Sequence, residues 1–422
     1  MPKSTTITGG VGVAPRRMPG RGLWLLGPAL VAGVAYLDPG NVASNMTAGA
    51  RYGYLLVWIV VAGNIMAWLI QYLSAKLGIV TGQSLPEVLG DRIRNRWARR
   101  AYWVQAELVA MATDVAEVIG GAVALNLLFG VPLLLGGAIT GSVSMVLLVV
   151  QTRRGPRHFE FVIIGLMATI VVGFVAGLVV APPDPAGVLA GLQPRFTDTG
   201  SVLLAASILG ATIMPHAIYA HSALVRDRFG SAREPNPPRI RTLLTATRWD
   251  VTIAMVIAGS VNLAILLLAA ANLAGVDGTD SLEGAHAALA QSLGPVIATL
   301  FAVGLLASGL ASTSVGAYAG AEIMQGLLKV RIPLLARRLI TLLPALGILA
   351  LNVDPTLALV LSQVVLSFGI PFALIPLVAL TAQRRTLGAH ANRRLTTALG
   401  ILFSVLLITL NAVLLWLVLT GA

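Results

Sequence analysis

Two short segments of this chain bring together side chains that can bind a metal ion. One is AYLDPGN at residues 35–41, with the carboxylate of Asp38 and the amide of Asn41. The other is ATIMPH at residues 211–216, with the thioether of Met214. Carboxylate and carbonyl oxygens suit hard divalent cations, whereas a thioether favours softer transition metals. The combination therefore predicts a site for Mn²⁺, Fe²⁺ or Cd²⁺ and would be an odd choice for Mg²⁺.

A proline in each segment must interrupt a helix. Both segments lie within long apolar runs, and a helix cannot pass Pro39 or Pro215 unchanged, because proline lacks an N–H and clashes with the preceding turn. In lipid, unwound backbone is tolerated only inside protein or beside a water-filled cavity, and paired broken helices mark a transporter's binding site. Unwinding also frees backbone carbonyl groups that can complete a metal shell, such as those of Ala35 and Ala211.

Simpler explanations exist for both segments. Asp-Pro-Gly-Asn is common in turns at helix ends, but Asp38 lies near the middle of its apolar run. A carboxylate at membrane depth is costly and usually functional. A methionine or histidine in a membrane helix usually serves packing or hydrogen bonding. A functional role for the second segment is favoured by Pro215. It lies 176 residues after Pro39 and has the corresponding position in the second half of the chain.

The composition is that of an integral membrane protein. Hydrophobic residues make up 57% of the chain and charged residues 11%, against roughly 25% charged residues in soluble domains. Apolar runs long enough for a hydrocarbon layer about 30 Å thick predict an all-α fold with eleven transmembrane helices. These helices are expected at about 24–46, 53–80, 101–129, 131–150, 159–181, 200–224, 249–274, 292–328, 333–351, 357–381 and 396–420.

The net charge of +12 could suggest a nucleic-acid partner, but its distribution indicates a membrane topology instead. Of the 29 basic residues, 27 fall on one side if the predicted helices alternate in direction. The two exceptions are Arg51 and Arg195. Cytoplasmic loops of membrane proteins are enriched in Lys and Arg, so this side is expected to be cytoplasmic. The N-terminus is then inside the cell and the C-terminus outside.

The helix count also predicts the domain organisation. We expect a disordered cytoplasmic tail over 1–22 and a single transmembrane domain over 23–422. Five helices from each break form repeats over about 23–181 and 200–381, and an odd number per repeat inverts the second. An extra helix follows at about 396–420. The absence of cysteine excludes a disulfide framework and a thiolate metal site.

These motifs, with others along the chain, resemble the Nramp family of divalent metal–proton symporters. They are DPGN, GATIMPH and HSALV at the breaks, GQSLPE after the second helix, TDVAE in the third and SGLASTSVGAYAG in the eighth. The resemblance implies a LeuT-type fold with broken helices 1 and 6, and proton-driven import of Mn²⁺ and Fe²⁺. It implies a metal site made by Asp38, Asn41, Met214 and the carbonyls of Ala35 and Ala211. One departure is AIYAH at residues 217–221, where the family has Asn-Leu-Tyr-Leu-His.

Three carboxylates share one face of the third predicted helix, within about 80° of one another: Glu107, Asp114 and Glu117. Such a buried acidic face indicates either a proton relay or a structural network paired with arginine. Arg337 and Arg338, at the start of the ninth predicted helix, are the candidate partners. The resemblance places Asp114, Glu117 and one arginine in a proton-exit route, while Glu107 stays open between the two roles.

The histidines and buried amides near the breaks have less specific patterns. His216 and His221 are about one and a half helical turns apart and face different ways, which argues against a two-histidine zinc site. His216 can carry or gate a proton because imidazole titrates near neutral pH, and the resemblance supports this role. His221 stays open between a gate and packing. Gln71 and Gln363 are expected to satisfy polar neighbours, although the resemblance puts Gln363 on the metal path.

Together these features predict a secondary active transporter rather than an enzyme. It would import Mn²⁺, Fe²⁺ and Cd²⁺ with protons across the plasma membrane by alternating access. Apart from these ions and the lipid bilayer, we expect no cofactor, no nucleic acid and no obligatory protein partner. The alternatives are a Mg²⁺ or amino-acid carrier of the same fold, a passive channel, and an intramembrane metal-dependent hydrolase. The thioether disfavours Mg²⁺, Asp38 disfavours an amino acid, and no His-x-x-x-His pair supports a hydrolase.

Overall fold

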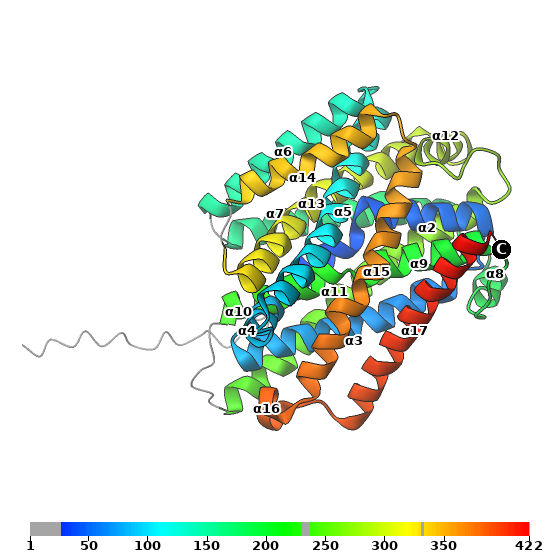
Figure 1. The fold of residues 1–422 in the computed structure, drawn as a ribbon. Coiled ribbons are helices and arrows are strands. Elements are labelled where there is room, and N and C mark those ends of the chain that lie inside the picture. The colour runs from blue at the N-terminus through cyan, green and yellow to red at the C-terminus, as the bar shows by residue number, and fades with distance from the viewer. Residues whose placement is uncertain (1–26, 155, 230–236, 331–332, 422) are drawn as a thin grey trace, which may run out of the picture.

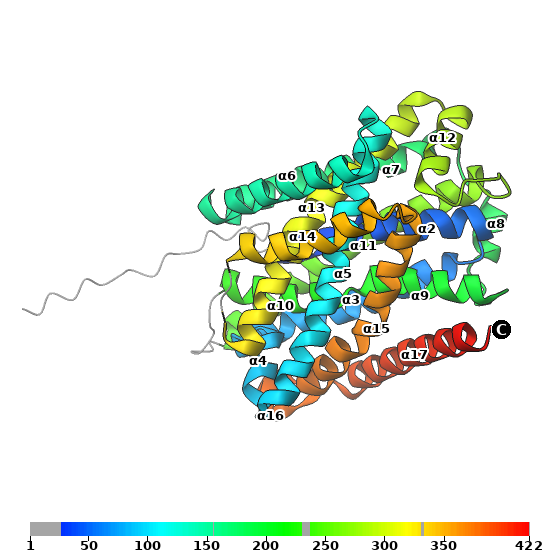
Figure 2. The same ribbon diagram turned by 45° about the horizontal axis from the view of Figure 1, so that its top comes forward.

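Helices account for every regular element in the part of the chain that the computed structural model describes. That part comprises residues 27–154, 156–229, 237–330 and 333–421. Figures 1 and 2 show the longer helices packed side by side in one bundle. The tail predicted over 1–22 lies outside the described residues.

Each of the eleven predicted ranges overlaps a helix or, at the two prolines, a pair of half-helices. They are α1 (Pro28–Val34) with the 3₁₀ turn η2 (Ala35–Leu37) and α2 (Pro39–Tyr52), α3 (Val57–Thr81), α5 (Arg96–Phe129), α6 (Leu133–Arg154), α7 (Pro156–Val180), α9 (Thr199–Ile213) with α10 (Pro215–Phe229), α11 (Pro237–Asn272), α13 (Pro295–Leu328), α14 (Leu334–Ala350), α15 (Pro355–Ala382) and α17 (Arg394–Thr420). In the described part of the chain, eight helices are long and apolar enough to cross a membrane, so the count of eleven spans stays a prediction.

The connections contain short elements that were not predicted. They are α4 (Leu85–Arg92), α8 (Pro185–Ala190), α12 (Leu282–Ser292), α16 (Arg384–Leu387) and the 3₁₀ turn η3 (Gly388–His390). Both views place α4 and α16 at one end of the bundle, and α8, α12 and the C-terminal end at the other. The connection expected over 225–248 is shorter than predicted, because helices α10 and α11 continue through their charged ends.

Proline explains where many of these helices begin. Among the described residues, eight helices have proline as their first residue, including both second halves, α2 and α10. The first N–H of a helix has no intrahelical acceptor, so a residue without an N–H fits there, and its fixed φ suits the helix. Pro39 and Pro215 therefore start new helices at once. The helix interruptions predicted at Asp38 and Met214 are confirmed.

The broken helices lie inside the bundle, where glycines allow close approach. α2 contacts α5, α9, α11 and α15. A Cβ on Gly120 of α5 would lie 2.0 Å from the Cβ of Pro39. A Cβ on Gly369 of α15 would lie 3.3 Å from the Cγ of Pro215. Each of the two prolines thus packs onto a glycine of a neighbouring helix, which positions both breaks.

Candidate metal centre and the adjacent ion-pair network

The first break holds the carboxylate of Asp38 in a defined orientation. Asp38 has extended backbone (φ −71°, ψ 161°) and caps α2, because its Oδ1 accepts the Asn41 backbone N–H at 2.8 Å. The side-chain amide of Gln363, on α15, donates to Oδ2 at 3.0 Å. Asp38 has no exposed surface (0%), and these bonds do not exhaust the lone pairs of its carboxylate. A buried anion with spare lone pairs is suited to binding a cation.

Neighbouring helices satisfy the carbonyl groups that the first break releases. The Tyr36 carbonyl accepts the side-chain amide of Asn41 and, at 3.1 Å, that of Asn262 on α11. The Leu37 carbonyl accepts the Ser308 hydroxyl of α13. The unwound backbone is thus enclosed by protein, as the interior of a bilayer requires.

The second break lies against the first. α9 ends at Ile213 and α10 begins at Pro215, with Met214 between them at φ 1° and ψ 110°. Met214 and Ala211 are fully buried, and so is Ala35 at the start of η2. α9 contacts η2 and α2, and α10 contacts α1. Segments about 176 residues apart in the sequence therefore converge inside the bundle.

Gln363 connects the two breaks. A Cβ on Gly40, next to the first break, would lie 1.8 Å from the Gln363 Nε2 that binds Asp38. A Cβ on Gly210, in the last turn of α9, would lie 1.9 Å from the Gln363 backbone oxygen. Glycine at these two positions lets α2 and α9 approach the same residue of α15. Ala211 follows Gly210 directly, so the second break also borders Gln363.

Three amides around the first break have buried oxygen atoms without a hydrogen-bond partner among the described residues. These atoms are Oδ1 of Asn45, Oδ1 of Asn262 and Oε1 of Gln363. Each of the three side chains donates its NH₂ group to an acceptor of the break. Unpaired buried acceptors are unusual, and together with Asp38 they make this break electronegative. No group of three His, Cys, Asp or Glu side chains in the described part could hold a metal, so the donor set here is mixed.

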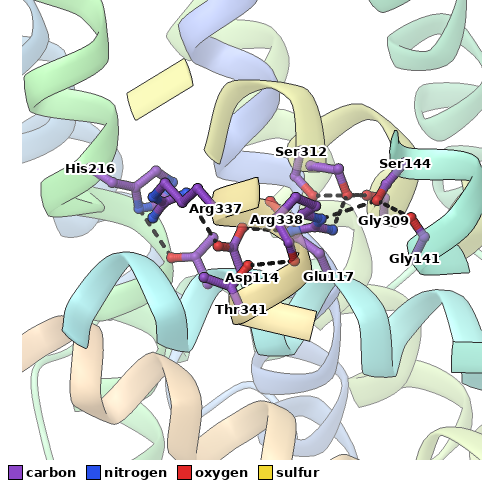
Figure 3. Close-up of polar contacts among 12 residues, drawn as sticks. Asp114, Glu117, Gly141, Ser144, His216, Gly309, Ser312, Arg337, Arg338 and Thr341 are labelled. Atoms are coloured by element: carbon purple, nitrogen blue, oxygen red, sulfur yellow. Dashed lines mark hydrogen bonds and ion pairs between the residues drawn. The ribbon is translucent and has the colours of Figure 1, made fainter. Parts of the chain in front are cut away.

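The carboxylates of α5 meet both arginines of α14 in a buried network, and Figure 3 shows Asp114 and Glu117 with these arginines. Arg338 Nη1 lies 2.6 Å from Asp114 and 3.2 Å from Glu117. Arg337 lies 2.9 Å from Glu107 and 3.4 Å from Asp114. The remaining N–H groups of Arg338 donate at 3.0 and 3.2 Å to the hydroxyls of Ser144 and Thr313.

The network confirms that Arg337 and Arg338 pair with these carboxylates. It also shows that both arginines are buried rather than exposed in a connection. The charge pattern had grouped Arg337 and Arg338 with the basic residues of a connection, but both are buried, with 4% and 1% exposure. Both arginines can be buried because each faces carboxylates. This pairing offsets the free-energy cost of removing a cation from water. Three carboxylates and two guanidinium groups leave one formal negative charge. Glu117 also has an Oε1 without a hydrogen-bond partner among the described residues.

The two histidines face different helices, as predicted. His216 Nδ1 lies 3.2 Å from the hydroxyl of Thr113 on α5, beside the ion-pair network (Figure 3). The Nδ1–H of His221 donates to Gln71 Oε1 on α3 at 2.7 Å, and the amide of Gln71 donates to the Tyr36 hydroxyl. His216 therefore borders the network, whereas His221 reaches the first break through Gln71.

Several residues that frame the first break were not singled out in the sequence. Asn45, Asn262 and Ser308 contact its backbone or side chains, as described above. Asp250 of α11 accepts two N–H groups at the start of α1, at 3.0 and 2.9 Å. A polar residue within an apolar run is the signal that could have identified Asn262, whereas Asn45 and Asp250 lie near the ends of their predicted ranges. Their partners could not have been identified, because these contacts join distant parts of the chain.

Polar contacts also join α2 to its neighbours at the end of the bundle that holds α8 and α12. The Tyr52 hydroxyl donates to Asp198 at 2.7 Å, and this hydrogen bond lowers the pKa of the Asp198 carboxyl below its usual value. Arg51 pairs with Asp280 at 2.6 Å, although both side chains are exposed. The half-helices α2 and α9 are thus held together at this end.

Comparisons with known proteins agree with this architecture. The profile of the family described as natural resistance-associated macrophage protein-like (Nramp) matches residues 29–417. The chain is 61% identical over 398 residues to the divalent metal cation transporter MntH of Mycobacterium tuberculosis, covering 94% of this chain and 92% of that protein. Its structure matches that of the Eremococcus coleocola manganese transporter with a TM-score of 0.83 and 32% identity. That match covers 94% of this chain and 88% of the other.

A more distant match concerns the fold alone. Mhp1, a nucleobase-cation-symport-1 family transporter, superimposes with a TM-score of 0.55 at 14% identity, over 92% of this chain and 90% of the other. The predicted all-α, LeuT-type class with broken first and sixth helices is therefore confirmed. With a family profile spanning nearly the whole described bundle and a relative at 61% identity, the chain belongs to the Nramp family.

Proposed function

We propose that this chain imports Mn²⁺, Fe²⁺ and Cd²⁺ across the plasma membrane together with protons. The chain is a transporter and not an enzyme, because it belongs to a family of transporters. Relatives named as a divalent metal cation transporter and a manganese transporter support a divalent transition metal as the cargo. The observation that carries the proposal is the buried Asp38 carboxylate, which lies among unpaired amide oxygens and is linked by Gln363 to the second break.

The contacts around the first break support a proposed donor set. Asp38 is the anionic ligand, and Gln363 fits as a ligand because its NH₂ binds Asp38 while its oxygen is unpaired. Asn41 presents an oxygen that already accepts the amide of Asn45, so a metal must share or displace that bond. Met214 supplies the thioether that selects softer cations. Backbone carbonyls complete the shell, those of Ala35 and Ala211.

The proton route follows the polar groups beside this centre. A dication next to Asp38 favours its ionised form, so metal binding releases a proton there. His216 lies between the second break and α5 and can pass the proton toward Asp114 and Glu117. The network beyond them consists of Glu107, Arg337 and Arg338, and His221 serves as a gate near Tyr36.

Alternating access uses the two halves of the bundle. The repeats predicted over 23–181 and 200–381 would rock about the central breaks, while the helix at 396–420 packs outside them. The end that holds α4 and α16 is the cytoplasmic end, because the basic connections gather there. The N-terminus then lies in the cytoplasm and the C-terminus outside the cell.

An uptake panel in proteoliposomes tests this function directly. We expect entry of Mn²⁺, Fe²⁺ and Cd²⁺ with acidification of the lumen, recorded by a trapped pH dye, and little entry of Mg²⁺ or Ca²⁺. Empty liposomes are the control. Uptake that ignores an imposed pH gradient would support a passive channel instead, and a preference for Mg²⁺ would support the alternative carrier.

Met214→Ala is expected to keep Mn²⁺ uptake but to admit Ca²⁺ and Mg²⁺. Loss of the thioether removes the donor that disfavours hard cations. The ratio of Mn²⁺ to Ca²⁺ uptake should fall roughly tenfold, equivalent to about 1.4 kcal/mol. Met167→Ala, which truncates a buried methionine of α7, outside both pairs of half-helices, is the matched control. An unchanged ratio in Met214→Ala would contradict a role for sulfur in selectivity.

A further inference from the structure

Three exposed arginines surround the start of α5: Arg94, Arg96 and Arg100. Within the described part of the chain, none of them has an ion-pair partner, and the first turn of α5 carries no carboxylate. Arg96 and Arg100 place their guanidinium carbons 5.3 and 5.2 Å from the ring centroid of Trp97. Trp97 is itself 62% exposed. We call these four residues the Trp97 patch.

Some basic residues at this end of the bundle are neutralised by carboxylates. Arg226 lies 2.7 Å from Glu87 and 3.1 Å from Glu322, and Lys329 lies 2.7 Å from Asp91. The Trp97 patch has no such partner among the described residues, and two like charges beside one ring repel each other. More exposed arginines occur at the same end, in α16 and at the start of α17, which adds to the positive field: Arg384, Arg385, Arg393 and Arg394.

We propose that the Trp97 patch binds the headgroup of an anionic phospholipid in the cytoplasmic leaflet. Guanidinium groups bind phosphate oxygens in a bidentate manner, so one phosphodiester can bridge Arg96 and Arg100 and offset part of their positive charge. α5 is long and apolar enough to cross the membrane, and its first turn therefore adjoins the headgroup layer. An exposed tryptophan suits this depth because its ring contacts lipid while its N–H faces polar groups. This apolar ring favours a lipid over a soluble anion.

The site rests on the proposed orientation of the bundle but not on metal transport. Its test therefore measures lipid binding, which fails or succeeds independently of metal uptake. Purified full-length protein in detergent is titrated with phosphatidylglycerol, phosphatidylcholine or inorganic phosphate, and the thermal unfolding midpoint is recorded. We expect phosphatidylglycerol to stabilise the protein at the lowest concentration.

The double variant Arg96→Gln/Arg100→Gln should lose most of this preference. Its apparent affinity for phosphatidylglycerol should fall up to roughly thirtyfold, from about fivefold per arginine near a lipid surface. The matched control is Arg393→Gln/Arg394→Gln, which removes two exposed arginines from the start of α17, where the sequence has no neighbouring tryptophan. It should keep the preference for phosphatidylglycerol, and an equal loss in both double variants would show a diffuse charge effect and overturn the site.

Fluorescence locates the bound lipid. Phosphatidylglycerol with brominated acyl chains should quench the wild-type protein more than Trp97→Phe, because the emission of Trp97 is then missing. Equal quenching in the two proteins would overturn the proposal. The same conclusion follows if phosphatidylcholine stabilises as well as phosphatidylglycerol, which would leave Trp97 as a general interfacial anchor, or if inorganic phosphate stabilises equally well.

Discussion

Asp38→Asn is expected to reduce Mn²⁺ uptake by proteoliposomes to the background of empty vesicles. Asparagine keeps the shape of the side chain and can still accept the Asn41 N–H that caps α2. The substitution removes the negative charge that faces the cation, and it replaces the oxygen that accepts the Gln363 amide with an NH₂ group. A contact between two unit charges at about 4 Å is worth about 4 kcal/mol in a protein site, so affinity for a divalent cation should fall by at least on the order of a thousandfold. Metal content is read by mass spectrometry of washed vesicles.

Asp184→Asn provides the matched control for this substitution. Asp184 also caps a helix, since its Oδ2 accepts the Gly187 N–H of α8 at 2.8 Å, but it is exposed and lies far from the breaks in the chain. Its variant should transport Mn²⁺ at the wild-type rate. Near-normal uptake by Asp38→Asn, with an unchanged unfolding midpoint, would refute the role of Asp38 as the anionic ligand.

Arg338→Met is expected to lower the free energy of unfolding by about 3–5 kcal/mol, as seen when one partner of a buried ion pair is removed. Arg338 is 1% exposed and is the cation closest to Asp114, at 2.6 Å. Without Arg338, the negative charges of Asp114 and Glu117 are only partly balanced by nearby cations in a medium of low dielectric constant. Denaturant titration in detergent, followed by tryptophan fluorescence, measures the change.

Two further variants test whether the lost stability comes from an uncompensated buried charge rather than from lost packing. Arg338→Met combined with Asp114→Asn and Glu117→Gln should recover most of the lost stability, because no uncompensated carboxylate remains near position 338. Lys329→Met removes a cation at the same short range, 2.7 Å from Asp91, but both side chains are half exposed. It should cost less than about 1 kcal/mol. Equal losses for Arg338→Met and Lys329→Met would contradict the buried-charge explanation.

The positions of the breaks were predictable because their cause is local. Proline lacks an N–H and clashes with the preceding turn, so breaks at Pro39 and Pro215 were expected without any tertiary information. Proline alone does not fix a break, however, because Pro344, Pro371 and Pro376 lie inside the continuous helices α14 and α15. The shared face of Glu107, Asp114 and Glu117 was equally accessible, since it depends only on the helical repeat. Long apolar runs identified the bundle because only helices satisfy their own backbone within lipid.

The partners of these groups were not predictable from spacing. Gln363 was one buried amide among several, and only packing shows that it binds Asp38 while its backbone borders Gly210. Asn262 was missed because an asparagine in an apolar helix does not reveal which carbonyl it will reach. The burial of Arg338 was missed for a related reason, since a basic residue at a helix end resembles one exposed at the membrane surface.

Local covalent chemistry and helical periodicity thus determined the class of the protein, the two interruptions and the types of donor atoms they carry. The tertiary structure decided which donors meet, which oxygens are left unpaired and which charges neutralise each other. The division has a physical reason. Helix geometry is set within four residues of any position, whereas a contact such as Asp38 with Gln363 joins residues 325 apart and depends on how whole helices pack.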